Sequence, residues 1–119
     1  MRNKLVNTAQ ILGLSPNDLH LIVETLRQFS TIERACVFGS RARGTAAYNA
    51  DIDIAIFGAS CTAETAQNLK FELDEELPLP YKFDVLHAES LTNTALRSNI
   101  ARDAVEIYSS VQTSSLLAA

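Results

Sequence analysis

The chain has 119 residues, of which 47% are hydrophobic and 20% are charged, and its formal net charge is −4 at pH 7. This size and composition fit one soluble globular domain over residues 1–119, which needs neither a metal nor a disulfide to stabilise its core. The acidic balance argues against a long nucleic acid as ligand, because affinity for a phosphate backbone depends on many Lys and Arg contacts. With no membrane-spanning apolar run, no secretion signal and no cysteine motif, we expect a cytoplasmic protein.

The first part of the chain predicts two helices, a strand and a turn. Residues 1–14 are mildly apolar and predict one short helix that ends at Gly13. Ser15 supplies an N-cap for a helix over residues 16–29, in which apolar residues recur every three or four positions. Strand-forming residues over 34–38 are followed by a turn that opens a short helix.

The second part alternates strands and helices. Residues 51–57 show the period-2 pattern of a strand, and a helix over 62–77 follows. A third strand is expected over 81–86, and apolar spacing of three and four residues predicts a last helix over 90–108. The core would then span about residues 16–108, with a flexible tail over 109–119.

This order of elements predicts an α/β fold in which helices cover one face of a small sheet. Successive side chains of a strand point to opposite faces, so one face of the second strand would be buried by three isoleucines: Ile52, Ile54 and Ile56. Asp51 and Asp53 share the opposite face of that strand, and Asp84 lies on the corresponding face of the third strand.

These three aspartates predict a cation site. Asp51 and Asp53 are two residues apart on a strand, about 7 Å at the backbone, so both can reach one divalent ion or two neighbouring ions. Asp84 would add a third carboxylate on the same sheet face. Like charges in such an arrangement repel one another unless a cation is present.

A turn at Gly39 and Ser40 predicts a phosphate-binding segment directly after the first strand. Glycine lets the backbone approach an anion, and the Ser40 hydroxyl can donate to a phosphate oxygen. We interpret Arg41 as a further phosphate contact, whereas the sequence leaves Arg43 open between a phosphate contact and a solvated position. A phosphate-binding turn beside a carboxylate site is typical of a metal-assisted nucleotide site.

Together these motifs resemble a known family. Gly39-Ser40, ten further residues and then Asp51-Ile52-Asp53, with Asp84 on a later strand, resemble the signature of the nucleotidyltransferase superfamily of DNA polymerase beta. The run Gly39-Ser40-Arg41-Ala42-Arg43-Gly44 is similar to that of minimal nucleotidyltransferases (MNT), the antitoxins of HEPN/MNT toxin–antitoxin pairs. The resemblance covers residues 16–108 and implies the nucleotidyltransferase fold, an α/β (α+β) arrangement with a mixed sheet of three to four strands.

The resemblance also implies an activity and a role for each site residue. Asp51 and Asp53 would bind two Mg²⁺ ions that hold ATP, and Asp84 would ligate the ion beside the attacking hydroxyl. Gly39 and Ser40 would contact the terminal phosphates. The reaction would transfer a nucleoside monophosphate and release pyrophosphate.

The implied partner is a small helical HEPN toxin encoded nearby, which the antitoxin would adenylylate on a hydroxyl within a homo- or hetero-oligomer. Larger members of the superfamily carry a further domain over the base and the acceptor, for which 119 residues leave no room. Two alternatives stay open at this point. The chain could be a non-catalytic antitoxin that binds nucleotide or occludes its partner, or a small-molecule nucleotidyltransferase of the antibiotic-modifying type.

Overall fold

The computed structural model describes residues 2–47 and 50–110 of the chain. The elements are, in order, helix α1 (Arg2–Leu12), helix α2 (Pro16–Arg27), strand β1 (Arg34–Phe38), helix α3 (Ser40–Arg43), strand β2 (Ile52–Phe57), helix α4 (Ala63–Phe71), a π-helix (Glu72–Glu76), strand β3 (Phe83–His87), a 3-10 helix (Ala88–Ser90), helix α5 (Thr94–Asp103) and strand β4 (Val105–Ser109). None of the described helices is both long enough and apolar enough to cross a membrane.

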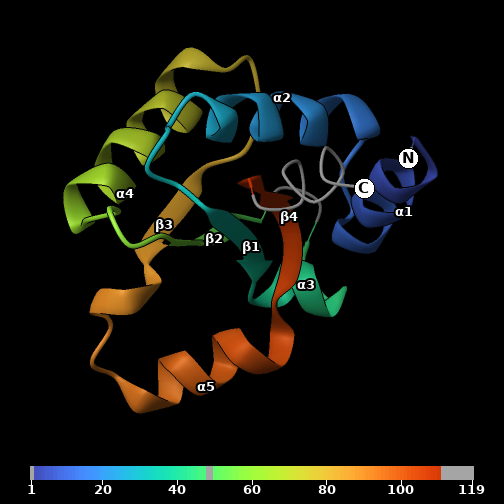
Figure 1. Cartoon of the computed structure of the whole chain (residues 1–119). Helices are drawn as coiled ribbons and strands as arrows, with labels where there is room; N and C mark the ends of the chain where they lie inside the picture. Colours follow the sequence, from blue (N-terminus) through green and yellow to red (C-terminus); the bar gives the residue numbers. More distant parts are fainter. Residues whose placement is uncertain (1, 48–49, 111–119) are drawn as a thin grey trace, which may run out of the picture.

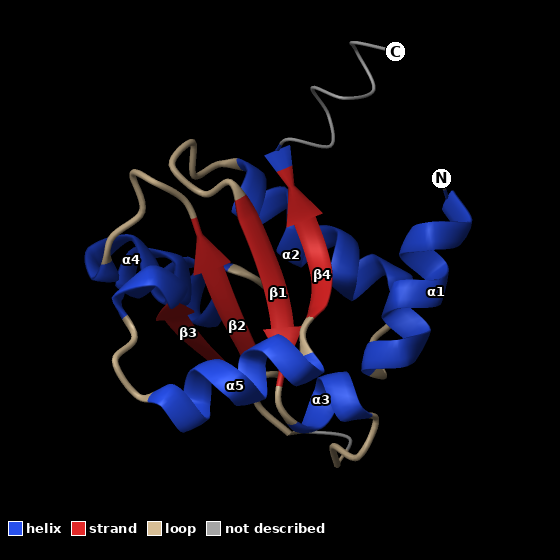
Figure 2. Cartoon of the chain, turned by 60° about the horizontal axis from the view of Figure 1, so that its bottom comes forward, coloured by secondary structure: helices blue, strands red, loops and turns tan. Residues whose placement is uncertain are grey.

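The four strands form one mixed sheet in the order β3-β2-β1-β4 (Figures 1 and 2). Strand β1 pairs antiparallel with both β2 and β4, whereas β2 and β3 are parallel. In this register Phe38 lies opposite Asp53, and Asp53 lies opposite Asp84. The sheet therefore places the end of β1, the start of β2 and the start of β3 side by side.

Helices α1, α2 and α4 lie over one face of the sheet, where the main core forms (Figure 1). The buried side of β2 packs into that core through Ile52, Ile54 and Ile56, which are almost fully buried. Each such side chain stabilises the fold by about 1.5–3 kcal/mol when it is removed from water. The alternation predicted for this strand is confirmed.

Helix α5 lies against the other face of the sheet (Figure 2). Its Ile100 packs in a smaller cluster with Phe38 and Ala55. The mixed α/β fold class is confirmed, and the expectation that helices cover one face holds for α1, α2 and α4. Because Ala55 and Asp53 point to the same side of β2, α5 covers part of the face that carries the aspartates.

Most of the predicted elements are confirmed within a few residues. The helix expected over 16–29 is α2, whose N-cap Ser15 accepts a hydrogen bond from the Asp18 N–H at 3.0 Å. The helix expected over 62–77 is α4 continued by the π-helix, and the three expected strands are β1, β2 and β3. The short helix expected before Gly13 is α1.

The helix predicted over 90–108 is wrong in its last part. Helix α5 ends at Asp103, and Val105–Ser109 form β4 instead. Strand β1 is buried over 35–38, so the backbone groups on the side that does not pair with β2 need hydrogen-bonding partners. The backbone of β4 provides these partners, and its β-branched and aromatic residues favour a strand. Of the tail expected over 109–119, Ser109 ends β4 and Ser110 donates its N–H to the Glu33 carbonyl at 2.9 Å. Residues 111–119 lie outside the described residues.

Candidate functional site

Asp53 lies at the centre of a group of three carboxylates. Its side chain is half-buried, whereas Asp51 and Asp84 are exposed on the sheet face. Burial, followed by the negative charges of Asp84 and Asp51, raises the pKa of the Asp53 carboxyl. The structure thus brings the three aspartates into one electrostatically coupled group.

The three carboxylates lie near one another, but their side chains are not gathered around one common position. Within the ranges 2–47 and 50–110, no three acidic, His or Cys side chains are gathered closely enough to hold a metal ion as they stand. Asp53 and Asp84 are nevertheless in register on neighbouring strands, whose backbones are about 4.8 Å apart. Side-chain rotation can close such a gap, and carboxylate oxygens are ligands that Mg²⁺ prefers. The donor set therefore fits a divalent cation.

Gly39 places the backbone of the turn directly against Asp53. Its φ is +77°, a conformation that favours glycine, and a Cβ added there would lie 2.5 Å from the Asp53 Oδ2 atom. Ser40 begins α3 beside this contact and is half-buried. The structure therefore brings Gly39 and Ser40 to the carboxylates, as their position after β1 predicts.

Arg41 is directed elsewhere. Its side chain is buried, and its guanidinium donates to the carbonyls of Leu12 and Ala50, each at 3.1 Å. The Cζ atom also lies 4.9 Å from the centroid of the Tyr81 ring. These contacts place the guanidinium between the end of α1 and the segment that leads into β2. Its bond to Ala50 fixes the segment that leads into Asp51.

Arg43, whose role the sequence left open, connects α3 to α5. Its Nη1 atom lies 2.8 Å from the Oδ2 atom of Asp103, which also pairs with Arg102. Hydrogen bonds from Arg102 and then from Arg43 hold the pKa of Asp103 below its usual range. This ion pair ties the end of α5 to the helix that follows Gly39.

Two residues near the carboxylates, Lys70 and Asp74, were not predicted from the sequence as part of the site. Lys70 and Asp74 both bind the backbone of Phe83, the residue that precedes Asp84. Their spacing of four residues on a predicted helix indicates an ion pair. The sequence gives no sign that this pair reaches β3, because the contact depends on how α4 packs against that strand.

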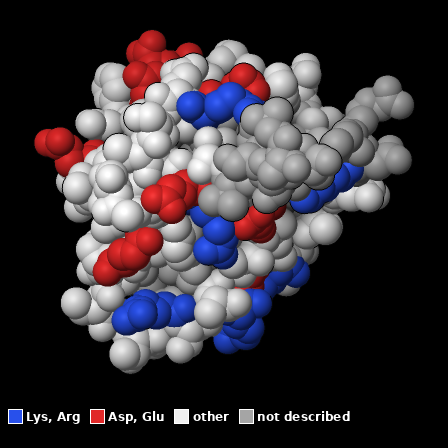
Figure 3. Space-filling model, in the orientation of Figure 1, with Lys and Arg blue, Asp and Glu red and all other residues white. Residues whose placement is uncertain are grey.

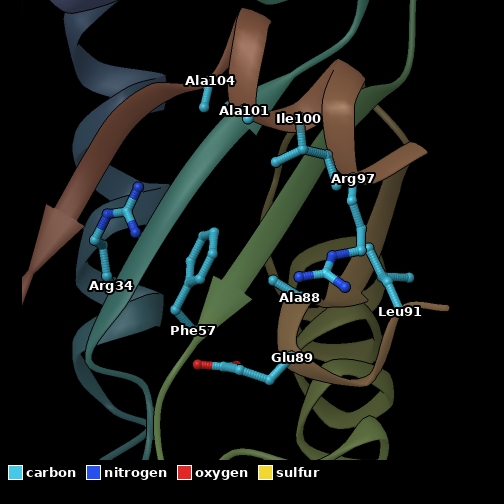
Figure 4. A pocket seen from close by; sticks show the side chains of 9 residues that line it. All are labelled: Arg34, Phe57, Ala88, Glu89, Leu91, Arg97, Ile100, Ala101 and Ala104. Atoms are coloured by element: carbon cyan, nitrogen blue, oxygen red, sulfur yellow. The ribbon is translucent and has the colours of Figure 1, made fainter. Parts of the chain in front are cut away.

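A cavity of about 430 Å³ lies at the other end of the same sheet face (Figure 4). Figure 4 shows the Phe57 ring with Arg34 to one side and Arg97 and Leu91 to the other, and with Glu89 at one end. Phe57 is four residues beyond Asp53 on β2, roughly 13 Å along the strand. This cavity is therefore separate from the carboxylates.

Charged side chains are mixed on the face of the molecule seen in Figure 3. Lys and Arg residues lie between Asp and Glu residues on this face and do not merge into one broad basic surface. Such a surface is what binding to a long phosphate backbone requires.

Residues 20–113 match the family described as Polymerase beta, Nucleotidyltransferase. The chain belongs to this family. The match contains the Gly39-Ser40 turn and all three aspartates of this nucleotidyltransferase domain. The comparison with curated proteins gives no match.

Solved structures of toxin–antitoxin complexes share the fold of this nucleotidyltransferase-family chain. A chain of a toxin–antitoxin complex with AMP-PNP has a TM-score of 0.65 and 24% identity, covering 82% of this chain and 78% of that one. A chain of the MntA–HepT toxin–antitoxin complex has a TM-score of 0.60 and 21% identity, covering 83% and 76%. The same values hold for a structure of tri-AMPylated Shewanella oneidensis HEPN toxin in complex with MNT antitoxin. At these identities the likeness shows a common fold.

Proposed function

We propose that this protein is a Mg²⁺-dependent nucleotidyltransferase that transfers AMP from ATP to a hydroxyl of a small helical HEPN toxin, and that it acts in the cytoplasm as the antitoxin. The observation that carries the proposal is the juxtaposition of Asp53 with Asp84 on one side and with Gly39 on the other, in a chain of the polymerase beta nucleotidyltransferase family. A metal-assisted nucleotide site needs carboxylates and a close backbone approach at one place.

The proposed roles follow from where each residue lies. Asp51 and Asp53 would hold the cations that bind ATP, and the backbone of Gly39 with the Ser40 hydroxyl would contact the terminal phosphates. Asp84, exposed beside Asp53, would face the acceptor and hold its hydroxyl proton as that proton leaves. When bound, Mg²⁺ would supply positive charge that stabilises the phosphates and lowers the pKa of the acceptor hydroxyl.

The reaction balances with these groups. The acceptor oxygen forms a bond to the α-phosphorus of ATP while the bond from that phosphorus to pyrophosphate breaks. Asp84 would accept the hydroxyl proton, and pyrophosphate would leave from the phosphate contacts at Gly39 and Ser40. Arg41 would contribute to this scheme by holding the Ala50 carbonyl next to Asp51.

The proposed acceptor is supported by the solved structures with the same fold. One is described as a toxin–antitoxin complex with AMP-PNP, and another contains an AMPylated HEPN toxin with an MNT antitoxin. Asp51 and Asp84 are exposed in this chain, and phosphoryl transfer is favoured by exclusion of bulk water. A partner that covers the open sheet face would provide that exclusion together with the acceptor.

The proposal is tested by incubating the full chain with the HEPN protein encoded beside it, labelled ATP and Mg²⁺, followed by intact mass analysis of both proteins. We expect the mass of one or more adenylyl groups on the HEPN protein, and no adduct with Asp53→Asn. Arg97→Ala, in the cavity at the far end of the sheet face, is the matched control and should retain transfer.

Two other outcomes would replace the proposal. Complex formation without any adduct from each of the four nucleoside triphosphates would favour the non-catalytic antitoxin. Transfer of nucleotide to small hydroxyl compounds, with the HEPN protein unmodified, would favour the small-molecule nucleotidyltransferase.

A further inference from the structure

Strand β3 is an edge strand of the described sheet, and one of its residues turns its backbone groups outward. The N–H of Ile52 in β2 donates to the carbonyl of Lys82 at 2.9 Å. Because backbone groups alternate in direction along a strand, the N–H and carbonyl of the next residue, Phe83, face away from β2. The Phe83 carbonyl belongs to the peptide group that joins this residue to Asp84.

Lys70 and Asp74 bind both of these backbone groups. The Asp74 Oδ1 atom accepts the Phe83 N–H at 2.9 Å, and the Lys70 ammonium donates to the Phe83 carbonyl. The same ammonium lies 2.8 Å from the Asp74 Oδ2 atom. The pair therefore forms a closed set of hydrogen bonds around the backbone of the residue that precedes Asp84.

The secondary structure between the two side chains is irregular. Lys70 lies in the last turn of α4, and Asp74 lies in the π-helix that begins at Glu72. π-helical turns are rare and occur frequently at functional sites. Here the π-helix contains several acidic residues. Among the described residues, Asp74 is the one of them whose side chain is hydrogen-bonded to the sheet.

Lys70 is also within electrostatic reach of the candidate site. Its pKa is raised first by the hydrogen bond to Asp74 and then by the charge of Asp74, with further contributions from Asp84 and Asp51. The Lys70 ammonium thus interacts electrostatically with Asp84 and Asp51 while it donates to the backbone of Phe83, next to Asp84.

We propose that Lys70 and Asp74 are positioning residues, which clamp the backbone of Phe83 from both of its peptide groups and so orient the carboxylate of the next residue, Asp84, toward Asp53 and a divalent cation. An ion pair four residues apart on a helix contributes little to stability by itself. The two bonds to Phe83 are what give the pair a role, because they fix an edge strand whose one sheet partner among the described residues is β2. The cation part of this inference rests on the proposed function.

The clamp is tested with Asp74→Ala, using Glu75→Ala as the matched control. Both substitutions remove one negative charge from the same π-helix, but the Glu75 side chain is exposed and makes no hydrogen bond with the described residues. Two quantities are measured on the full chain: hydrogen exchange of the Phe83 amide without metal, and Mn²⁺ affinity by calorimetric titration. Asp74→Glu, which keeps the charge but displaces the carboxylate by one methylene, is the second variant in case Asp74→Ala does not fold.

We expect the Phe83 amide to exchange at least about tenfold faster in Asp74→Ala than in Glu75→Ala, because only the former loses the acceptor. Mn²⁺ binding should weaken at least about threefold more in Asp74→Ala than in the control, since loss of the hydrogen bonds that hold a metal ligand in place typically reduces metal affinity. Asp74→Glu should change both quantities in the same direction.

Each contrary result has a distinct meaning. Equal Phe83 exchange in Asp74→Ala and Glu75→Ala would overturn the clamp, whatever the metal does. Faster exchange with equal Mn²⁺ affinity in the two variants would overturn its role in orienting Asp84. A wild-type chain that binds no Mn²⁺ would contradict the proposed cation site and with it that orienting role, while the exchange result would still decide whether the clamp exists.

Discussion

The backbone of Gly39 and the carboxylate of Asp53 are packed so closely that no side chain fits between them: an added Cβ would lie 2.5 Å from the Asp53 Oδ2 atom. This contact follows from the sheet, because β1 and β2 pair with Phe38 opposite Asp53. The turn after β1 and the backbone of Asp53 on β2 therefore have a fixed relative position.

Gly39→Ala should destabilise the protein more than Gly44→Ala. Both glycines have a positive φ near +77°, but a Cβ at Gly44 would meet no atom within 4 Å. Gly44→Ala is therefore expected to cost about 1 kcal/mol through strain in the left-handed region. Gly39→Ala should cost about 3 kcal/mol, because its ψ of −155° gives a conformation open almost only to glycine and the Cβ would also displace the Asp53 carboxylate. Urea unfolding measures both. Equal losses would show that Asp53 can move away from the turn without penalty.

Asp51→Asn and Asp53→Asn should each reduce nucleotide transfer by at least about a hundredfold, the scale seen when one electrostatic group of a transition state is lost. Asp53→Asn should also raise the thermal midpoint of the metal-free protein, because burial and the charges of Asp84 and Asp51 disfavour an ionised Asp53. Turnover and thermal melting are measured on the same samples. If both variants keep full turnover, these residues do not hold the cations.

Arg41→Lys should destabilise the fold by about 2 kcal/mol, since the shorter, single-headed ammonium cannot reach carbonyls on two segments at once. The control is Arg43→Lys, whose exposed side chain pairs with Asp103 and whose change should stay below about 1 kcal/mol. Denaturant midpoints measure this difference. Should Arg41→Lys keep its midpoint and instead bind ATP tenfold more weakly, a direct phosphate contact would have to be restored.

Cys36 and Cys61 should be unreactive in the native protein at pH 8. Burial raises the pKa of both thiols, so each forms thiolate only at a higher pH than an unfolded cysteine does. We expect alkylation by iodoacetamide on the order of a hundredfold more slowly than in urea, with the rate rising as the pH is increased. Peptide mass mapping resolves the two positions. Fast native labelling of Cys36 would indicate that β4 separates from β1.

Features that depend on local pattern could be predicted from the sequence. The face shared by Asp51 and Asp53 follows from strand alternation, and the place of Gly39 follows from its position directly after a strand. Asp84 could be placed on the corresponding face for the same reason. Its alignment with Asp53 required only that β2 and β3 be neighbours, which the structure confirms.

Features that depend on distant packing could not be predicted. The apolar residues of the short run 104–108 fit both the helical and the strand period. Pairing with the free edge of β1 makes this segment a strand. The neighbours of Arg41 in the sequence indicate a phosphate contact, but they give no sign of its hydrogen bond to the Leu12 carbonyl from 29 positions earlier. Asp74 likewise acquires its role from β3, nine residues later.

The pairing of β4 with β1 has a consequence for folding of the protein during its synthesis on the ribosome. Among the described residues, β1 acquires its second neighbour from Val105–Ser109, so a nascent chain in which this segment is still inside the ribosome exposes the mostly apolar edge of β1. Such edges pair readily with those of other unfinished chains. Synthesis of this protein should therefore be most vulnerable to aggregation immediately before its last strand emerges, and chains truncated ahead of Val105 should accumulate in inclusion bodies.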